Sequence, residues 1–423
     1  MNMNNSTEKY ISVHETEPGP MGWMQGFPPA KDKVLSAADG SFFEFPALRY
    51  SVNHMREFIP TREVPGNKEK DGVHKFHVKH IKGIDEVTFI PWKETNPITW
   101  AESLEKNFTD GIIILHRGHI VYERYFAGLT PWGHHAAMSV SKSVAGLLAS
   151  ILIAEGKLDE HRTVASYIPE LEASGFGDAT VKNVLEMTTA IQFTENYDDL
   201  NSDIWKFSQS GNIFRGSNYT GPSCYYEYLP LIQKNPAHDH GEVFGYKTAN
   251  TAVLGWIISR VTGKGLAQLL SEVVWRPMGA ANDAYYQLDP VGIAFAGGGL
   301  NLNLRDMALL GELLRCQGKL NGIQIIPKKA VQEITKGGDP CAFEKSKEYP
   351  ALEGWSYRNM WWITHNHHQA YMARGVHGQA IYIDPVAEMV IARFASNPLS
   401  SNKYIDPLSL PAYEAVANYL LGC

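Results

Sequence analysis

The sequence predicts an α+β fold in which an antiparallel sheet is flanked by helices and joined to a mostly helical domain. β-rich segments lie towards both ends of the chain, at residues 111–115 and 120–125 and again at 380–384 and 389–394. Helical patterns and long loops fill the region between them. Strands at both ends with helices between them indicate a sheet that is built from both terminal parts and interrupted by an insertion.

The strand segments are identified by their residue types. Gly111 begins a run of isoleucines, and His116-Arg-Gly-His separates it from residues 120–125, which predicts a hairpin around a glycine-containing turn. Residues 380–384 and 389–394 are expected to pair around Asp384-Pro385. Residues 86–90 form a shorter β-rich segment before the hairpin.

The predicted helices are apolar segments that end at glycine or before proline. The most apolar of them covers residues 141–155 and ends at Gly156. The others are expected at residues 181–188, 251–262, 266–274, 305–316 and 413–421.

The chain has 423 residues, which favours more than one structural unit. We expect residues 1–80 to be an N-terminal extension that wraps the body, because they are rich in proline, glycine and charge. Residues 81–160 and 286–423 are expected to form one α/β domain, and residues 161–285 a mostly helical domain.

Composition excludes several classes of function. The net charge of −7 provides no basic excess for phosphate contacts, so nucleic acid is not an expected partner. The longest apolar run, residues 144–154, is about half of what a bilayer crossing requires, so no membrane partner is expected. Four separated cysteines and the absence of a signal-like N-terminus favour a cytoplasmic location. A homo-oligomer is compatible with the sequence.

No metal and no cofactor are expected. The clusters His365-Asn-His-His and His238-Asp-His lack a third ligand at a recognised spacing. No G-x-S-x-G motif surrounds any serine, so an α/β-hydrolase nucleophile is not supported either.

One short motif carries nucleophilic chemistry. Ser139 and Lys142 form an S-x-x-K, and Ser139 leads directly into the apolar helix; the three other S-x-x-K matches in the chain do not. Residues three apart share one face of a helix, so the serine hydroxyl and the lysine amine are expected to meet. A serine needs a base to become a nucleophile, and a buried lysine with a lowered pKa can be that base.

Longer segments resemble the serine β-lactamase and penicillin-binding-protein superfamily. Residues 139–159, SVSKSVAGLLASILIAEGKLD, resemble its nucleophile helix. Residues 183–195, 240–246 and 296–300, with Arg305-Asp306 after the last, resemble three further segments of the family, so that the resemblance spans roughly residues 85–420. It implies a β-lactamase/transpeptidase-like fold.

Within the superfamily, the 6-aminohexanoate-dimer hydrolases and related esterases are the most similar branch. The second motif reads Tyr246-Lys-Thr, with Thr248 where the family usually has asparagine. The third region reads Arg374-Gly-Val-His-Gly-Gln, and the lysine of the lactamase K-T-G motif is replaced by Ala373.

The resemblance implies a role for each matching residue. Ser139 is the nucleophile, Lys142 is its general base, and Tyr246 passes a proton to the leaving group, its phenol kept acidic by Lys142. The backbone N–H groups of Ser139 and Val376 are expected to form the oxyanion hole.

Three residues are expected to contact or shape the substrate site. Thr248 is expected to hydrogen-bond Lys142 or a leaving amine, and His377 to shape the pocket. Tyr197 is expected to close over the substrate, and a buried structural tyrosine is the alternative. An acidic residue that binds a substrate amine is expected a little after Tyr197, where Ser208 stands; Asp203 is nearby.

The sequence therefore predicts a serine hydrolase that cleaves a small-molecule amide or ester through an acyl-enzyme. A β-lactamase or DD-peptidase is the first alternative, although the K-T-G motif is missing. A ligand-binding relative without turnover is the second alternative.

Overall fold

The structure, a computed structural model, describes residues 12–69, 71–215 and 218–423. The first eleven residues of the predicted N-terminal extension therefore lie outside the described residues.

Among the described residues, the largest sheet has seven strands in the order β11-β12-β13-β14-β15-β4-β5, and all of its neighbouring pairs are antiparallel. Its strands are β4 (Thr109–His116), β5 (His119–Tyr125), β11 (Ser356–Arg358), β12 (Trp361–Ile363), β13 (Tyr371–Gly375), β14 (Gln379–Asp384) and β15 (Met389–Ala395).

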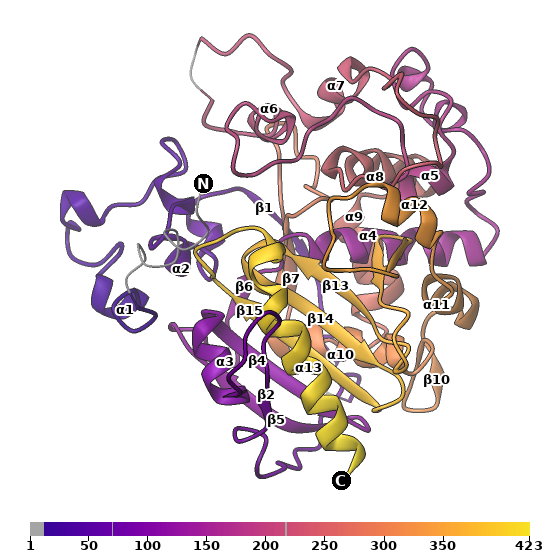
Figure 1. Ribbon diagram of the computed structural model, residues 1–423. Coiled ribbons are helices and arrows are strands. Elements are labelled where there is room, and N and C mark those ends of the chain that lie inside the picture. Colours follow the sequence, from indigo (N-terminus) through magenta and orange to yellow (C-terminus); the bar gives the residue numbers. More distant parts are fainter. Residues whose placement is uncertain (1–11, 70, 216–217) are drawn as a thin grey trace.

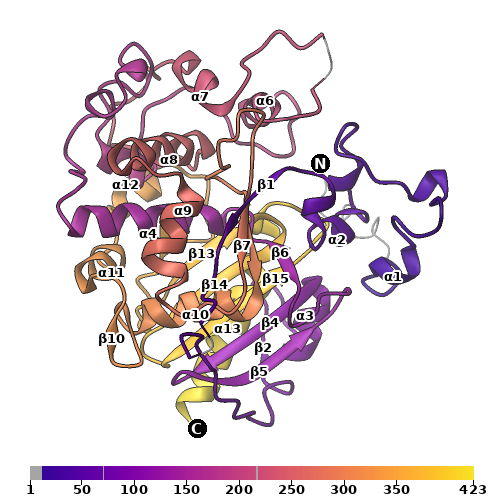
Figure 2. The same cartoon turned by 180° about the vertical axis from the view of Figure 1, so that it is seen from behind.

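The two ends of the chain meet inside this sheet. β15 pairs with β4, so that Met389 lies opposite His116 and Ile391 lies opposite Ile114. All residues of these two strands are buried, because helices cover both faces. α13 (Asp406–Leu421) lies on one face and α10 (Leu304–Arg315) packs on β4, β14 and β15 from the other (Figures 1 and 2). The predicted α+β class with an antiparallel sheet is confirmed.

A second sheet has the order β1-β7-β8-β6 among the described residues. Its strands are β1 (Thr61–Val64), β6 (His134–Ala136), β7 (Ala284–Gln287) and β8 (Leu300–Asn303). β1 comes from the N-terminal segment and pairs antiparallel with β7. The N-terminal segment, indigo in Figure 1, thus contributes a strand to the fold, which the sequence did not predict.

The predicted apolar helix is α4 (Val140–Ala154), and it is buried on all sides over most of its length. It contacts α8 (Thr248–Thr262), α11 (Lys328–Thr335) and the sheet strand β13. A Cβ on Gly146 would stand 2.0 Å from the carbonyl oxygen of Asn359, so glycine is needed where α4 meets the turn between β11 and β12. The Ser143 hydroxyl donates to the carbonyl of Met360 in the same turn at 2.6 Å.

A helix is present at each of the other predicted segments, and the structure also contains helices that the sequence did not predict. Two of the predicted helices have different bounds in the structure. α13 begins seven residues earlier than predicted and continues through Pro411. The helix predicted at residues 266–274 is regular only as α9, because residues 271–275 form a π-helical turn. The remaining helices are α1 (Pro18–Met21), α2 (Leu48–Ser51), α3 (Trp100–Lys106), α5 (Val181–Leu185), α6 (Asp203–Ser210), α7 (Tyr225–Tyr228), α9 (Leu266–Leu270) and α12 (Pro340–Lys345). The short strand pairs are β2 (Thr88–Phe89) with β3 (Ile98–Thr99), and β9 (Lys319–Leu320) with β10 (Ile323–Gln324). Within the described part of the chain, no helix has the length and apolar character that a membrane crossing needs.

Candidate active site

Ser139 stands at the turn that leads from β6 into α4. The preceding residue, Met138, has a φ of 48°, a left-handed conformation that costs a non-glycine residue about 1 kcal/mol or more. This turn places Ser139 at the N-terminus of a 15-residue helix, where backbone N–H groups and the helix dipole favour negative charge. Ser139 is 6% exposed and lines a cavity of about 470 Å³.

Lys142 lies one helical turn further along α4 and points back at the serine. Its Nζ donates to Ser139 Oγ at 3.0 Å and to the carbonyl oxygen of Gly297 at 2.8 Å. The side chain is 1% exposed, and this burial lowers the pKa of Lys142 to about 8, while the negative charge of Glu195 opposes the shift. An amine with this pKa is partly neutral near physiological pH and can accept a proton.

Tyr246 completes this group from the segment just before α8. Lys142 Nζ lies 5.0 Å from the centroid of the Tyr246 ring. The ring of Trp362 in β12 stacks on Tyr246, with 5.5 Å between the two ring centroids. Burial raises the pKa of Tyr246, and the negative charge of Glu195 raises it further, against the effects of Ser139 and Arg374. This direction is opposite to that of the expected acidic phenol, and it keeps the Tyr246 hydroxyl protonated.

Val376 is brought to the same cavity by the end of β13. A Cβ on Gly375 would stand 2.8 Å from the carbonyl oxygen of Ala137 and 3.0 Å from the Met138 side chain, so only glycine allows this approach. Val376 and Ser139 consequently line one cavity. Among the described residues, neither the Val376 N–H nor the Ser139 N–H has a hydrogen-bond acceptor.

Glu195 is one of the residues of the site that sequence reasoning missed. It lines the cavity and accepts a hydrogen bond from the Thr248 hydroxyl at 2.6 Å and another from the Thr248 backbone N–H, the first N–H of α8. The Tyr197 hydroxyl donates to the same carboxylate at 2.7 Å. Its sequence signals were its place two residues before Tyr197 and its position at the end of residues 183–195, which resemble a family segment.

Thr248 and His377 have partners other than the expected ones. The Thr248 hydroxyl donates to Glu195, whereas Lys142 donates to Ser139 and Gly297. A contact of Thr248 with a leaving amine stays a prediction. His377 is buried with Nδ1 2.7 Å from the Asn397 carbonyl, packs edge-on against Phe43 and does not line the cavity. Burial lowers the pKa of His377 to about 4, so the ring is neutral. Tyr197 does line the cavity, as expected.

Acidic residues are present in the cavity, but Asp203 is not one of them. The Asp203 carboxylate accepts from the backbone and hydroxyl of Thr194 at 3.0 Å and pairs with Lys206. Asp198, directly after Tyr197, lines the cavity instead, and so does the carboxylate of Glu348. Burial raises the pKa of this carboxyl.

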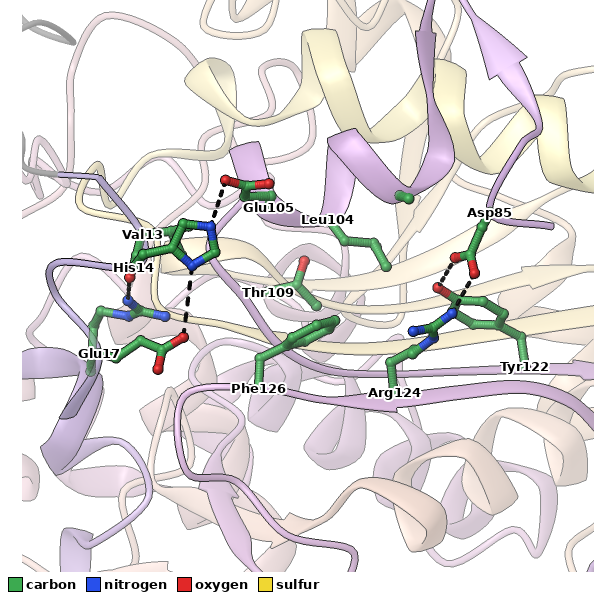
Figure 3. Close-up of a pocket in the computed structure, with 12 residues that line it drawn as sticks. Val13, His14, Glu17, Asp85, Leu104, Glu105, Thr109, Tyr122, Arg124 and Phe126 are labelled. Atoms are coloured by element: carbon green, nitrogen blue, oxygen red, sulfur yellow. Dashed lines mark hydrogen bonds and ion pairs between the residues drawn. The ribbon is translucent and has the colours of Figure 1, made fainter. Parts of the chain in front are cut away.

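A second cavity, of about 180 Å³, lies between the N-terminal segment, α3 and the strands β4 and β5 (Figure 3). Leu104 and Phe126 point into it, and pairs such as Asp85 with Arg124 lie at its rim. Among the described residues its lining contains no serine, cysteine or lysine. It therefore lacks the nucleophile and base that the first cavity holds.

Comparisons with known proteins agree with this geometry. Residues 102–404 match the family model described as Beta-lactamase. A 6-aminohexanoate-dimer hydrolase of Paenarthrobacter ureafaciens is 33% identical over 297 residues, which is 70% of this chain and 75% of that protein.

Solved structures show the same fold. A Bacillus anthracis protein named as a candidate 6-aminohexanoate-dimer hydrolase superposes with a TM-score of 0.82 at 32% identity, over 93% of this chain and 99% of that one. A family VIII carboxylesterase shares the fold with a TM-score of 0.56 at 17% identity, over 81% of this chain and 99% of that one. The chain therefore belongs to the β-lactamase family and is a hydrolase of that family.

Proposed function

We propose that the protein hydrolyses a small amide or ester through an acyl-enzyme on Ser139. The observation that carries this proposal is the 3.0 Å contact between Lys142 Nζ and Ser139 Oγ at a cavity of about 470 Å³. A nucleophile within hydrogen-bond reach of a base whose pKa lies near the operating pH is the arrangement that covalent catalysis requires.

In the proposed acylation, neutral Lys142 takes the hydroxyl proton as Ser139 Oγ attacks the substrate carbonyl. The carbonyl oxygen becomes an oxyanion, and the free N–H groups of Ser139 and Val376 support its placement between them. The tetrahedral intermediate collapses when the carbon–nitrogen or carbon–oxygen bond breaks. Tyr246 gives its proton to the leaving group and regains one from the Lys142 ammonium beside its ring. Water then releases the acyl group by the same steps.

The cavity favours an apolar acyl group. Its wall includes the aromatic side chains of Phe193, Tyr197, Tyr349 and Trp362. Most of the other lining residues are polar or charged, so the preference for an apolar acyl group rests on this aromatic part of the wall. The names of the relatives support amides and esters as the bonds that the protein cleaves.

The site is poorly suited to β-lactams. Ala373 is buried in β13 and replaces the lysine that helps to bind the lactam carboxylate in penicillin-recognising relatives. The neighbouring Arg374 is buried, and its guanidinium pairs with Asp406 while lying 4.6 Å from the Trp362 ring centroid. Its charge is thus already neutralised inside the protein.

The test of the proposed function is a comparison of kcat/KM for p-nitrophenyl butyrate, the 6-aminohexanoate dimer and nitrocefin under one condition. We expect the ester to be cleaved fastest, because its leaving group needs little protonation. The amide is expected to be slower, since a neutral Tyr246 must deliver a proton to the departing nitrogen. Nitrocefin is expected to be the slowest.

Two outcomes would contradict the proposal. Nitrocefin turning over faster than the ester would favour the β-lactamase alternative. Binding of these compounds without turnover of any of them would favour a ligand-binding relative. Clear dimer cleavage would indicate that an acidic group in the cavity, such as Glu348, reaches the substrate amine.

A further inference from the structure

The Glu195 carboxylate lies where three parts of the site meet. It accepts hydrogen bonds from the first residue of α8, Thr248, through both the backbone N–H and the hydroxyl. It also accepts from Tyr197, which lines the cavity. The hydrogen bond from the first N–H of α8 places this carboxylate at the N-terminus of a 15-residue helix, the positive end of the helix dipole.

Burial lowers the pKa of Lys142, and the negative charge of this carboxylate raises it. The groups around Lys142 are the hydroxyl of Ser139 on its own helix, the carbonyl of Gly297, the ring of Tyr246 and the charge of Glu195. Among the described residues, Lys142 Nζ donates to Ser139 and Gly297 and makes no ion pair with Glu195. Its oxygens are instead occupied by Thr248 and Tyr197.

We propose that Glu195 is a positioning residue of the proposed hydrolase: it holds Tyr197 and the start of α8 in place, and it supplies a fixed negative charge for the Lys142 ammonium that forms when Ser139 is deprotonated. This inference rests on the proposed function. Glu195 acts through Lys142 and Tyr197 and has no direct part in the bond that breaks.

The physical need for such a charge follows from the burial of Lys142. Burial alone favours the neutral amine so strongly that it becomes a weak base, because a buried ammonium is costly. A carboxylate held at a distance reduces that cost and keeps the amine able to accept the serine proton. A direct ion pair would raise the pKa of the lysine too far, because it would keep the amine protonated and unable to accept a proton. The hydrogen bonds from Thr248 and Tyr197 prevent this by fixing the carboxylate.

The test is the pH dependence of kcat/KM for p-nitrophenyl butyrate in Glu195→Gln, which keeps the shape of the side chain and removes its charge. We expect the acidic limb to move to lower pH by about one pH unit, because the Lys142 pKa falls when a nearby negative charge is lost. The plateau above the limb is expected to fall as well, because the amine is then a weaker base.

Two control variants separate charge from structure. Thr248→Val removes one hydrogen bond to Glu195 and keeps its charge, so the limb should stay at or above the wild-type pH. Asp198→Asn removes a different carboxylate, which lines the same cavity and pairs with Lys403, and its acidic limb should stay at the wild-type pH.

An unmoved limb in Glu195→Gln, or an equal downward shift in Thr248→Val, would overturn the inference. If Glu195→Gln does not fold, the acidic limb of Thr248→Val decides the test. A limb at a lower pH than in the wild type would contradict the inference, because this variant keeps the Glu195 charge. Ser139→Ala separates a failure of the proposed function from a failure of this inference. Activity that remains in Ser139→Ala would refute the proposed function. An inactive Ser139→Ala, together with an unchanged acidic limb in Glu195→Gln, would refute only the role of Glu195.

Discussion

Ser139→Ala is expected to reduce ester hydrolysis by about 10³-fold or more while the protein stays folded. The hydroxyl is the group that Lys142 contacts at the cavity, so its removal leaves no atom to form the acyl-enzyme. The measurement is the rate of p-nitrophenyl butyrate hydrolysis by purified wild type and variant, with thermal unfolding as the test of folding.

Ser150→Ala is a matched control for this variant. Ser150 is also a buried serine of α4, but its hydroxyl donates to the Gly146 carbonyl at 2.7 Å and it does not line the cavity. Its loss is expected to cost some stability and little activity. Near wild-type turnover in Ser139→Ala would show that the nucleophile has been assigned to the wrong residue.

Lys142→Ala is expected to be almost as inactive, and Lys142→Arg is expected not to restore activity. Arginine keeps a positive charge at all accessible pH values and cannot accept the serine proton. If Lys142 only supplied positive charge, the arginine variant would be active. Both variants should be compared by kcat/KM and by thermal unfolding, because Lys142 is a large buried side chain.

The wild-type pH profile is part of the same prediction. The base must be neutral, and the pKa of Lys142 is lowered to about 8, so activity should rise as the pH increases and be half-maximal near that value. A limb near the ordinary lysine pKa of about 10.4 would contradict the buried position of Lys142. The residual activity of Lys142→Ala should not show this rise with pH.

The sequence predicted the fold because its central elements are long and apolar. β4 and β15 are buried at every position, and α4 is buried over most of its length, so residue type alone marks them. β11 and β12 were not predicted because each has only three residues and they join through a tight turn at Asn359 and Met360. The division into three domains and the oligomeric state stay predictions.

The site was only partly predictable, for a different reason. Ser139 and Lys142 are near each other in the sequence, so helical spacing is enough to place them together. Trp362 reaches the cavity from a distant segment that no local pattern marks. Glu195 ends a segment that resembles the family, but its contacts with Thr248 and Tyr197 cannot be read from the sequence. The direction of the His377 side chain depends on the Asn397 carbonyl and on Phe43 of the N-terminal segment. The catalytic roles of Ser139, Lys142, Tyr246 and Val376 remain predictions that the proposed experiments test.

The most direct test of the central claim is the intact mass of the protein after rapid acid quenching during turnover of p-nitrophenyl butyrate. A covalent acyl-enzyme predicts a species heavier than the free protein by one butyryl group, with the added mass on the peptide that contains Ser139. Ser139→Ala should show no such species under the same conditions. Turnover by the wild type without any acylated protein, or acylation on a peptide that lacks Ser139, would contradict the account.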